Sequence, residues 1–257
     1  MKGVLASVAI ALAAGQALAG PIPLAERKSG YEFMSQETRA LQDDAATGPA
    51  AFALLEGESL WNRREGSAGK SCADCHGDAR AKMAGVAARY PAFDPRAGKP
   101  LTLEQRIVQC RRDNQQAPAL APESRELLAL AAHVGLASRG IAIAPDPHPG
   151  AQAHREAGQA IFQRRMGQLN LSCAQCHDDN WGKSLAGSRI PQGHPTGYPI
   201  YRLEWQAMGS LTRRLRSCMT GVRATPYAWG SAEMVDLEMY LMQRAAGMKV
   251  ETPAVRP

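Results

Sequence analysis

The stretch Cys72-Ala73-Asp74-Cys75-His76 occurs a second time, with one change, as Cys173-Ala174-Gln175-Cys176-His177. Each is a CxxCH motif, which is the attachment signal for c-type haem. One motif alone is also compatible with a redox dithiol or half of a zinc site, but two motifs without a further CxxC to complete a zinc tetrad favour haem. The sequence therefore predicts two covalently bound haem c groups. Their attachment residues are Cys72, Cys75, Cys173 and Cys176, and their first iron ligands are His76 and His177.

The two motifs belong to a longer internal repeat. Residues 57–64 align with residues 158–165 at the offset of 101 that also relates the motifs. Further along, the offset becomes 108, and a seven-residue insertion after the second motif accounts for the change. At that offset Tyr90-Pro91, Leu103, Arg106 and Cys110 align with Tyr198-Pro199, Leu211, Arg214 and Cys218. A repeat of this kind indicates that one structural unit is used twice.

Helical spacing dominates both repeats. Leu103, Ile107 and Cys110 lie on one helix face, and Thr102 with Gln105 forms a capping-box pattern at the start of that helix. No alternating strand pattern of useful length appears, so we expect an all-α fold with two cytochrome c-type domains. The expected parts are a signal peptide (1–19), an N-terminal extension that wraps over the haem domains (20–50), haem domain 1 (51–140), a linker (141–150) and haem domain 2 with the active site (151–257).

The first nineteen residues have the features of a secretory signal peptide. Lys2 precedes an apolar stretch from Val4 to Ala14, and Ala17-Leu18-Ala19 is a small-residue cleavage site. The apolar stretch is shorter than the roughly 20 residues that a spanning helix needs. We therefore expect a periplasmic protein without a membrane span.

The composition argues against a nucleic-acid-binding protein. The 257-residue chain has a formal net charge of +6, its basic residues are scattered, and aromatic residues make up 5%. No nucleic-acid-reading module is visible. A modestly basic surface suits an anionic small substrate or an acidic protein partner.

Two of the six cysteines, Cys110 and Cys218, lie outside the haem motifs. A disulfide is the default for spare thiols in an exported protein, but a bond between these two would take each out of its own repeat. Methionine is a common second iron ligand in c-type cytochromes, and the candidates are Met83, Met208, Met219, Met234 and Met239. Only the cysteines recur at the same place in both repeats. We therefore expect His/Cys ligation of both irons, by His76 with Cys110 and by His177 with Cys218.

Arginines surround both of these cysteines. Guanidinium groups lower the pKa of a nearby thiol and hold oxyanions through paired hydrogen bonds. A solvated surface charge or a haem-propionate partner is the alternative role for each arginine. Arg214 stands out because it lies one helical turn before Cys218 on the same face.

At this point the chain resembles a known family, the SoxA subunit of L-cysteine S-thiosulfotransferase. The resemblance covers nearly the whole mature chain. It depends on the stretch Gly30 to Ser35, Gln42-Asp43-Asp44, both CxxCH motifs, and the stretch Arg214 to Met219. Taken together, these motifs are highly specific.

The resemblance implies a partner, a substrate and roles for several residues. SoxA proteins form a heterodimer with a monohaem cytochrome, SoxX, and act on a cysteine of the sulfur carrier SoxYZ. Cys218 would be both a ligand of the second haem and the catalytic cysteine, held as a persulfide. Arg214 would bind the anionic substrate, and Cys110 would ligate the first haem.

The implied activity is the oxidative conjugation of thiosulfate to the carrier cysteine, with electrons leaving through haem to SoxX and then to a soluble cytochrome c. Two other classes of protein remain as alternatives. A dihaem electron carrier would use Cys218 only as a ligand, and a dihaem peroxidase would need an open iron face.

Overall fold

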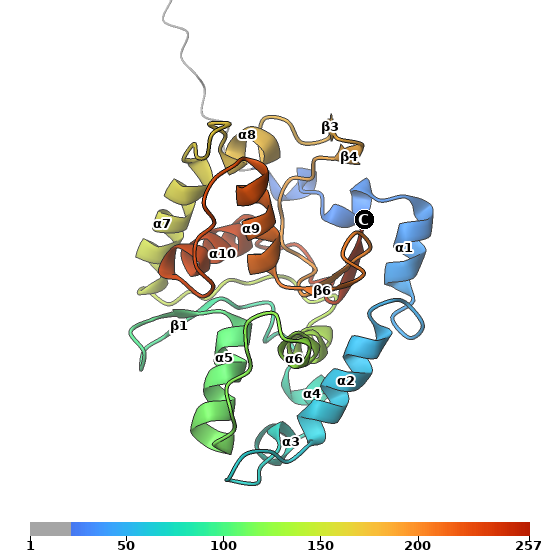
Figure 1. The fold of residues 1–257 in the computed structure, drawn as a ribbon, viewed down its shortest axis with the longest axis vertical. Helices are drawn as coiled ribbons and strands as arrows, with labels where there is room; N and C mark the ends of the chain where they lie inside the picture. The colour runs from blue at the N-terminus through green and yellow to red at the C-terminus, as the bar shows by residue number, and fades with distance from the viewer. Residues whose placement is uncertain (1–21) are drawn as a thin grey trace, which may run out of the picture.

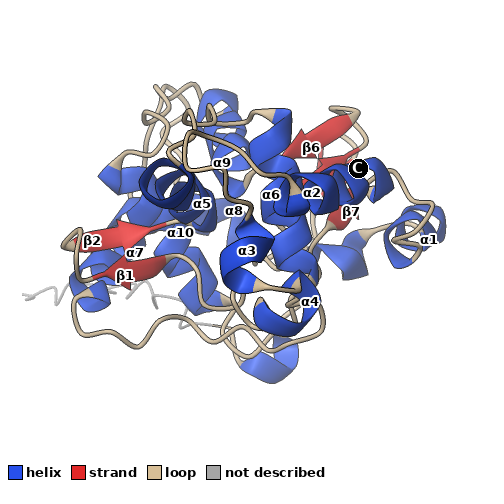
Figure 2. Ribbon diagram, turned by 90° about the horizontal axis from the view of Figure 1, so that it is seen from below, coloured by secondary structure: helices blue, strands red, loops and turns tan. Residues whose placement is uncertain are grey.

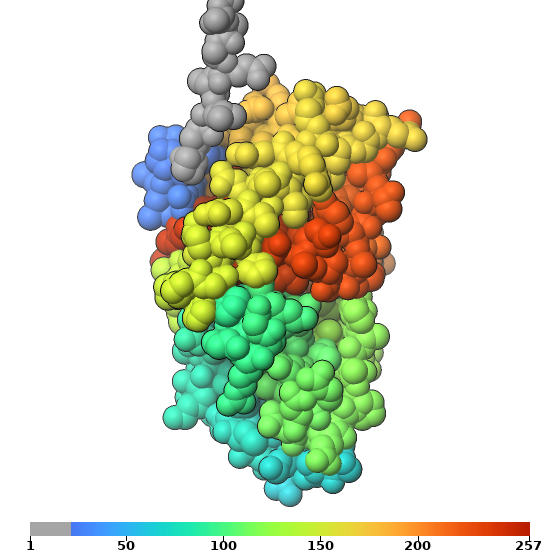
Figure 3. Space-filling model, turned by 90° about the vertical axis from the view of Figure 1, so that its left-hand side faces the viewer, coloured from blue at the N-terminus to red at the C-terminus, as the bar shows by residue number. Residues whose placement is uncertain are grey.

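The computed structural model describes residues 22–257, so the expected signal peptide lies outside the described residues. Within that range, no helix combines the length and the apolar character needed to cross a bilayer. Figure 1 shows the elements. Figure 3 shows the first repeat, coloured cyan to green, at one end of the molecule, and the second repeat, coloured yellow to red, at the other end together with the N-terminal segment in blue. In chain order the elements are η1 (Leu24–Glu26), η2 (Gly30–Phe33), α1 (Gln36–Asp43), α2 (Ala51–Asn62), α3 (Cys72–His76), α4 (Ala79–Lys82), β1 (Ala92–Asp94), β2 (Lys99–Leu101), α5 (Leu103–Cys110), η3 (Arg111–Gln115), α6 (Arg125–Leu136), α7 (Ala151–Gln163), α8 (Cys173–His177), β3 (Ser184–Leu185), β4 (Ser188–Arg189), β5 (Ile200–Arg202), β6 (Ala207–Gly209), α9 (Leu211–Gly221), α10 (Ala232–Arg244) and β7 (Ala254–Arg256).

The repeat in the sequence is a repeat in the structure. The series α2, α3, β1, β2, α5, α6 in the first half matches α7, α8, β5, β6, α9, α10 in the second. The strands match residue for residue at the offset of 108, because β1 and β5 pair with β2 and β6 in the same antiparallel register. The capping box at Thr102 and Gln105 is present, and Ser210 caps α9 by accepting from the Arg213 amide. Corresponding positions of the two halves can therefore be compared directly.

The prediction of an all-α fold is only partly correct. Helices form the two halves, but seven short strands are present among the described residues. Figure 2 shows them as small ribbons at the edges of the helical layers. Each strand has two or three residues, which is too short for an alternating pattern to be visible in the sequence.

In each half the first helix crosses the last at a glycine. Gly57 of α2 faces α6, and Gly158 of α7 faces α10. A Cβ at Gly57 would clash with the carbonyl oxygen of Ala129, and one at Gly158 with that of Asp236. The absence of a side chain lets the two backbones approach closely, and this brings Phe162 of α7 into the same core as Leu237 of α10.

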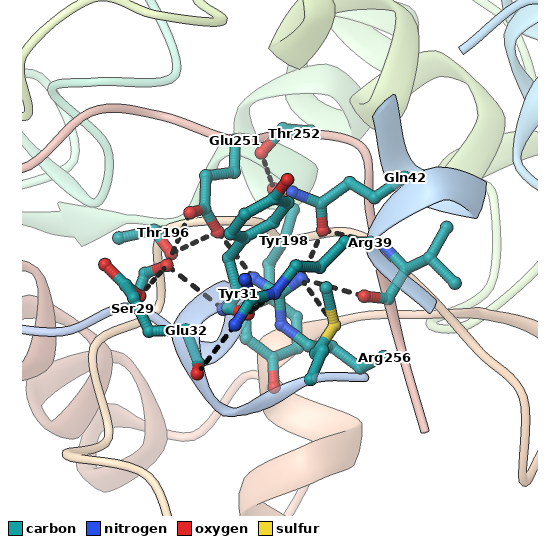
Figure 4. Close-up of polar contacts among 12 residues, drawn as sticks. Ser29, Tyr31, Glu32, Arg39, Gln42, Thr196, Tyr198, Glu251, Thr252 and Arg256 are labelled. Atoms are coloured by element: carbon teal, nitrogen blue, oxygen red, sulfur yellow. Dashed lines mark hydrogen bonds and ion pairs between the residues drawn. The ribbon is translucent and has the colours of Figure 1, made fainter. Parts of the chain in front are cut away.

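The N-terminal extension lies mainly against the second half. The backbone amide of Lys28 donates to Gln192 Oε1 at 2.6 Å. Gln42 of α1 accepts from the Val255 amide of β7 at 3.2 Å and also from the Arg256 guanidinium. Figure 4 shows Gln42 beside Arg256, within a network of polar contacts that also contains Ser29, Thr196 and Glu251. The extension and the C-terminal strand thus form one wall of the second half.

Three carboxyl groups meet where the two halves pack together. Glu104 of α5 and Glu238 of α10 line a cavity of about 60 Å³ between the halves, and Glu123 contacts the nearby Ser210 amide. Burial, followed by the negative charge of Glu104, raises the pKa of Glu238 to about 8, although a hydrogen bond from Thr212 opposes this shift. The Glu238 carboxyl is therefore protonated at neutral pH.

This shift predicts how stability depends on pH. In the unfolded chain the Glu238 carboxyl loses its proton near pH 4.5, whereas in the folded protein it keeps the proton up to about pH 8. Its contribution to stability is therefore complete below the lower value and is lost as the pH rises to the higher one. We expect Glu238→Gln to flatten the pH dependence over this window and to raise the free energy of unfolding above pH 8 by a few kcal/mol. Denaturant unfolding at several pH values checks this, and parallel curves for the parent and the variant would contradict it.

Candidate functional site

The second CxxCH motif forms the short helix α8, and its start is fixed by side chains of its own. Ser172 Oγ accepts from the Gln175 amide at 3.2 Å, and Gln175 Oε1 accepts from the Ser172 amide at 2.9 Å. This capping box sets the direction of the helix. Cys173 packs against the core that contains Phe162, and Cys176 lies one turn further along. Both thiols are thereby presented on one short, rigid helix.

His177 is held through one ring nitrogen and lies near Cys218. Its Nδ1 is 2.7 Å from the carbonyl oxygen of Pro191, and its side chain is close enough to the Cys218 thiol to lower the pKa of that thiol. A carbonyl partner on one ring nitrogen is the usual way to orient a histidine that ligates a metal through the other. The structure thus brings His177 and Cys218 face to face.

The electrostatic surroundings of Cys218 favour its thiolate form. Burial acts to raise its pKa, but the hydrogen bond from His177 and the charges of Arg214 and Arg202 outweigh burial, so the net pKa is lowered. Burial raises the pKa of Cys173 to about 11 and raises that of Cys176 as well. Cys218 is therefore the thiol in the second half that is prepared for reaction or for metal ligation.

These residues fit a covalently attached haem. Cys218 lies close enough to Cys173 and Cys176 to affect the pKa values of both, so four donor side chains border one space. The two thiols of α8 would form the thioether bonds, and His177 and Cys218 would be the iron ligands.

Arg214 is near Cys218, and its guanidinium has no hydrogen bond or ion pair with any residue in the range 22–257. Tyr198 and Arg202 share the site, because the charges of Arg214, Arg202 and Cys218 all act on the Tyr198 hydroxyl. Burial raises the pKa of Tyr198 to about 12, so this hydroxyl stays protonated and can donate. Sequence reasoning assigned no role to Tyr198 or Arg202. The signal that could have found Arg202 is its alignment with Asp94 at the offset of 108.

The first half has the corresponding cysteines and histidine, but the pKa of its second cysteine is shifted in the opposite direction. Cys110 is near the thiols of Cys72 and Cys75, as a haem site requires. Burial raises the pKa of Cys110 and raises that of Cys72 to about 11. His76 is exposed and lies beside Trp61, with ring centroids 5.8 Å apart. His76 is not among the groups that shift the pKa of Cys110, whereas His177 lowers the pKa of Cys218.

The six cysteines are all free. Cys110 and Cys218 lie on α5 and α9, in different halves of the molecule, and each is near the motif of its own half. The disulfide that export would otherwise favour is therefore not formed in this structure. The arrangement agrees with the reason given above for rejecting it.

Comparisons with known proteins identify the family of the chain. A family model described as SoxA/TsdA, cytochrome c domain, matches residues 56–143 and 157–250. The L-cysteine S-thiosulfotransferase subunit SoxA of Pseudaminobacter salicylatoxidans is 38% identical over 91% of this chain and 82% of its own length. The subunit of the same name from Rhodovulum sulfidophilum is 36% identical over 92% and 84%. A solved structure described as SoxXA from P. pantotrophus aligns with a TM-score of 0.86 and 32% identity, covering 90% of this chain and 87% of the other.

Proposed function

The chain belongs to the SoxA family of cytochromes c, and from this premise we propose that it is an L-cysteine S-thiosulfotransferase subunit. In this role it joins thiosulfate to a cysteine of a sulfur-carrier protein. The observation that supports this most strongly is the contrast between two equivalent thiols. The pKa of Cys218 is lowered, whereas that of Cys110 is raised.

The protein carries covalent haem c, and we extend the proposal to two such groups. Cys72 and Cys75 attach the first, and Cys173 and Cys176 attach the second. The proposed iron ligands are His76 with Cys110 and His177 with Cys218. When bound, the haem supplies the route by which electrons leave toward SoxX and a soluble cytochrome c.

The proposed reaction balances as a two-electron oxidation. The carrier thiolate and the thiosulfate dianion form a sulfur–sulfur bond, which gives a thiosulfonate and releases two electrons. Cys218 contributes a sulfur that is kept in the thiolate form by His177 and by nearby positive charge. The proposal includes Cys218 as the catalytic cysteine, held as a persulfide that forms when thiosulfate transfers its outer sulfur to the thiolate and releases sulfite. A persulfide is a known reversible state of a reactive cysteine.

Arg214 is the proposed substrate-binding residue. Its guanidinium is near Cys218 and is not engaged by a residue of the described chain, so it is available to a sulfonate group. A planar guanidinium binds such oxyanions through two parallel hydrogen bonds. Arg214 would thus hold two of the three oxygens and leave the outer sulfur free to face the reacting thiols.

The proposed partners are SoxX, in a heterodimer, and the carrier SoxYZ. The proposed compartment is the periplasm, reached with the signal peptide 1–19. The proposed domains are those of the repeat, with haem domain 1 at 51–140, a linker at 141–150 and haem domain 2 at 151–257. The extension 20–50 completes the second domain, where residues 22–50 make contacts with β7.

An arginine in each repeat provides a matched test of this function. We expect Arg214→Gln to raise KM for thiosulfate about 10- to 100-fold, because a charge-assisted hydrogen bond to a dianion is lost. The control is Arg106→Gln at the equivalent position, where the guanidinium is already bound to Asp94 at 2.9 Å. Steady-state kinetics with thiosulfate and the carrier protein measure both. Equal effects of the two changes on KM would contradict the assignment of the substrate to the Cys218 site.

A further inference from the structure

Each cysteine site contains an arginine, Arg106 in the first repeat and Arg214 in the second. The charge near this arginine differs between the repeats because one aligned position carries opposite charges. Asp94 is the last residue of β1, and Arg202 is the last residue of β5, at the same register of matching hairpins. An acidic residue in the first repeat is thus replaced by a basic residue in the second. The arginine that follows on the next helix, Arg106 or Arg214, is the same in both.

In the first repeat this arginine is fully occupied. Arg106 donates through Nη2 to Asp94 at 2.9 Å, through Nη1 to Gln109 at 2.9 Å and through Nε to the Tyr90 hydroxyl at 3.2 Å. Asp94 is 3% exposed and also accepts from the Arg96 amide of its own hairpin. The positive charge is neutralised by a buried carboxylate, and each of the three guanidinium nitrogens already donates to a protein acceptor.

In the second repeat two of these three acceptors are gone. The position of Asp94 is taken by Arg202, and that of Gln109 by Ser217, whose hydroxyl donates to the Arg213 carbonyl instead. Only the tyrosine is retained, as Tyr198. This explains why Arg214 has no partner among residues 22–257, and it places a second positive charge where the first repeat has a negative one.

Arg202 is itself positioned toward the interior of the site. Its side chain is 15% exposed, and its charge acts on both Cys218 and Tyr198. It packs 5.4 Å from the ring centroid of Trp205. Its ion pair is with Glu204 through Nε at 2.8 Å, and Glu204 is 64% exposed. A carboxylate in contact with water screens the Arg202 charge much less than the buried Asp94 screens Arg106.

We propose that Arg202 is a second anion-binding residue of the Cys218 site, and that the exchange of Asp94 for Arg202 between the repeats makes one cysteine site receptive to a doubly charged sulfur oxyanion and the other not. The proposal rests on the function proposed above, since it assigns the substrate class of the same site. Two guanidinium groups match the two negative charges of thiosulfate. Tyr198, which is near enough to both for their charges to act on its hydroxyl, adds a neutral donor.

The role of Arg202 is tested by replacing it with aspartate, the residue at the aligned position of the first repeat. We expect Arg202→Asp in the holoprotein to raise KM for thiosulfate about 100-fold, because a charge is lost and Arg214 gains a carboxylate partner. KM for the carrier protein should not rise. Arg202→Lys keeps the positive charge, so its KM for thiosulfate should rise by less than about tenfold. Haem content measured on each variant shows whether it has folded, and Arg202→Gln is the milder substitution if the aspartate variant does not fold.

A change at Glu204 separates binding from a structural role. If Arg202 binds substrate, Glu204→Gln removes a competing negative charge and should lower KM for thiosulfate or leave it unchanged. If Arg202 serves only to hold the hairpin through its ion pair, Glu204→Gln should raise KM as Arg202→Asp does. That result would overturn the proposal.

The Arg214→Gln variant, measured in the same experiment, separates the role of Arg202 from the proposed function of the protein. A raised KM in Arg214→Gln with an unchanged KM in both Arg202→Asp and Arg202→Gln would overturn the role of Arg202 and leave the function standing. A parent protein that does not conjugate thiosulfate to the carrier at all would overturn the function, and the role of Arg202 with it.

Discussion

Replacing Cys218 with serine is expected to lower kcat/KM for thiosulfate conjugation by on the order of 10³-fold or more, the scale of loss seen when a reacting side chain is removed. A serine hydroxyl has no accessible anionic form at neutral pH and cannot hold a persulfide. His177 would remain in place, because its Nδ1 is bound to the Pro191 carbonyl and not to Cys218. The measurement is the rate at which thiosulfate becomes attached to the carrier protein, followed by mass spectrometry.

Cys110→Ser is the matched control for that experiment. Cys110 occupies the equivalent position, but burial raises its pKa, and its neighbouring Arg106 is neutralised by Asp94. We expect this variant to retain a rate within about tenfold of the parent. A Cys218→Ser variant that conjugates thiosulfate as fast as the parent would leave only an electron carrier.

Removing both attachment thiols of α8 is the second change with a large expected effect. The double variant Cys173→Ala with Cys176→Ala should lose one covalent haem and all thiosulfate conjugation. Cys173 is part of the core that holds Phe162 and Leu237, so the second half should also lose stability. Intact mass spectrometry under denaturing conditions counts the haems that remain attached.

The equivalent change in α3 provides the comparison. Cys72→Ala with Cys75→Ala should also lose one haem, and combining the two pairs should leave none. A parent protein with the mass of a single haem, or a double variant in α8 that keeps the mass of the parent, would contradict the proposal of two haem groups.

Most of the architecture could be predicted because it is repeated. A CxxCH motif that occurs twice, each time followed by a cysteine at a distance that differs only by the seven-residue insertion, is enough to place α3 with α5 and α8 with α9. The capping box at Thr102 also marks the start of α5 correctly. These features are local, so they are visible in the order of residues alone.

The features that the sequence did not predict depend on contacts between distant segments of the chain. The strand β7 pairs in parallel with β5, and α1 packs on β7, but strands of three residues leave no periodic signal. The carboxyl cluster at the interface arises because Glu104 and Glu238 come from different halves. Neither residue is unusual within its own helix, so the raised pKa of Glu238 follows only from the packing.

The role proposed for Arg202 could be predicted only in part from the sequence. An isolated arginine after a short apolar stretch suggests a surface charge, and its ion pair with the exposed Glu204 fits that interpretation. Its meaning appears only when the second repeat is compared with the first, where Asp94 binds Arg106. The alignment of Asp94 with Arg202 is visible in the sequence. The ion pair between Asp94 and Arg106, which makes this exchange important, is visible only in the structure.

The central claim is that Cys110 and Cys218 each serve the haem of their own half, and that Cys218 is the reactive one. A peptide mass map of the holoprotein, prepared without reductant after exposure to thiosulfate, tests this claim most directly. The account predicts two separate peptides, with the mass of an additional sulfur atom on the one that contains Cys218. A single product in which Cys110 and Cys218 are joined by a disulfide would contradict it.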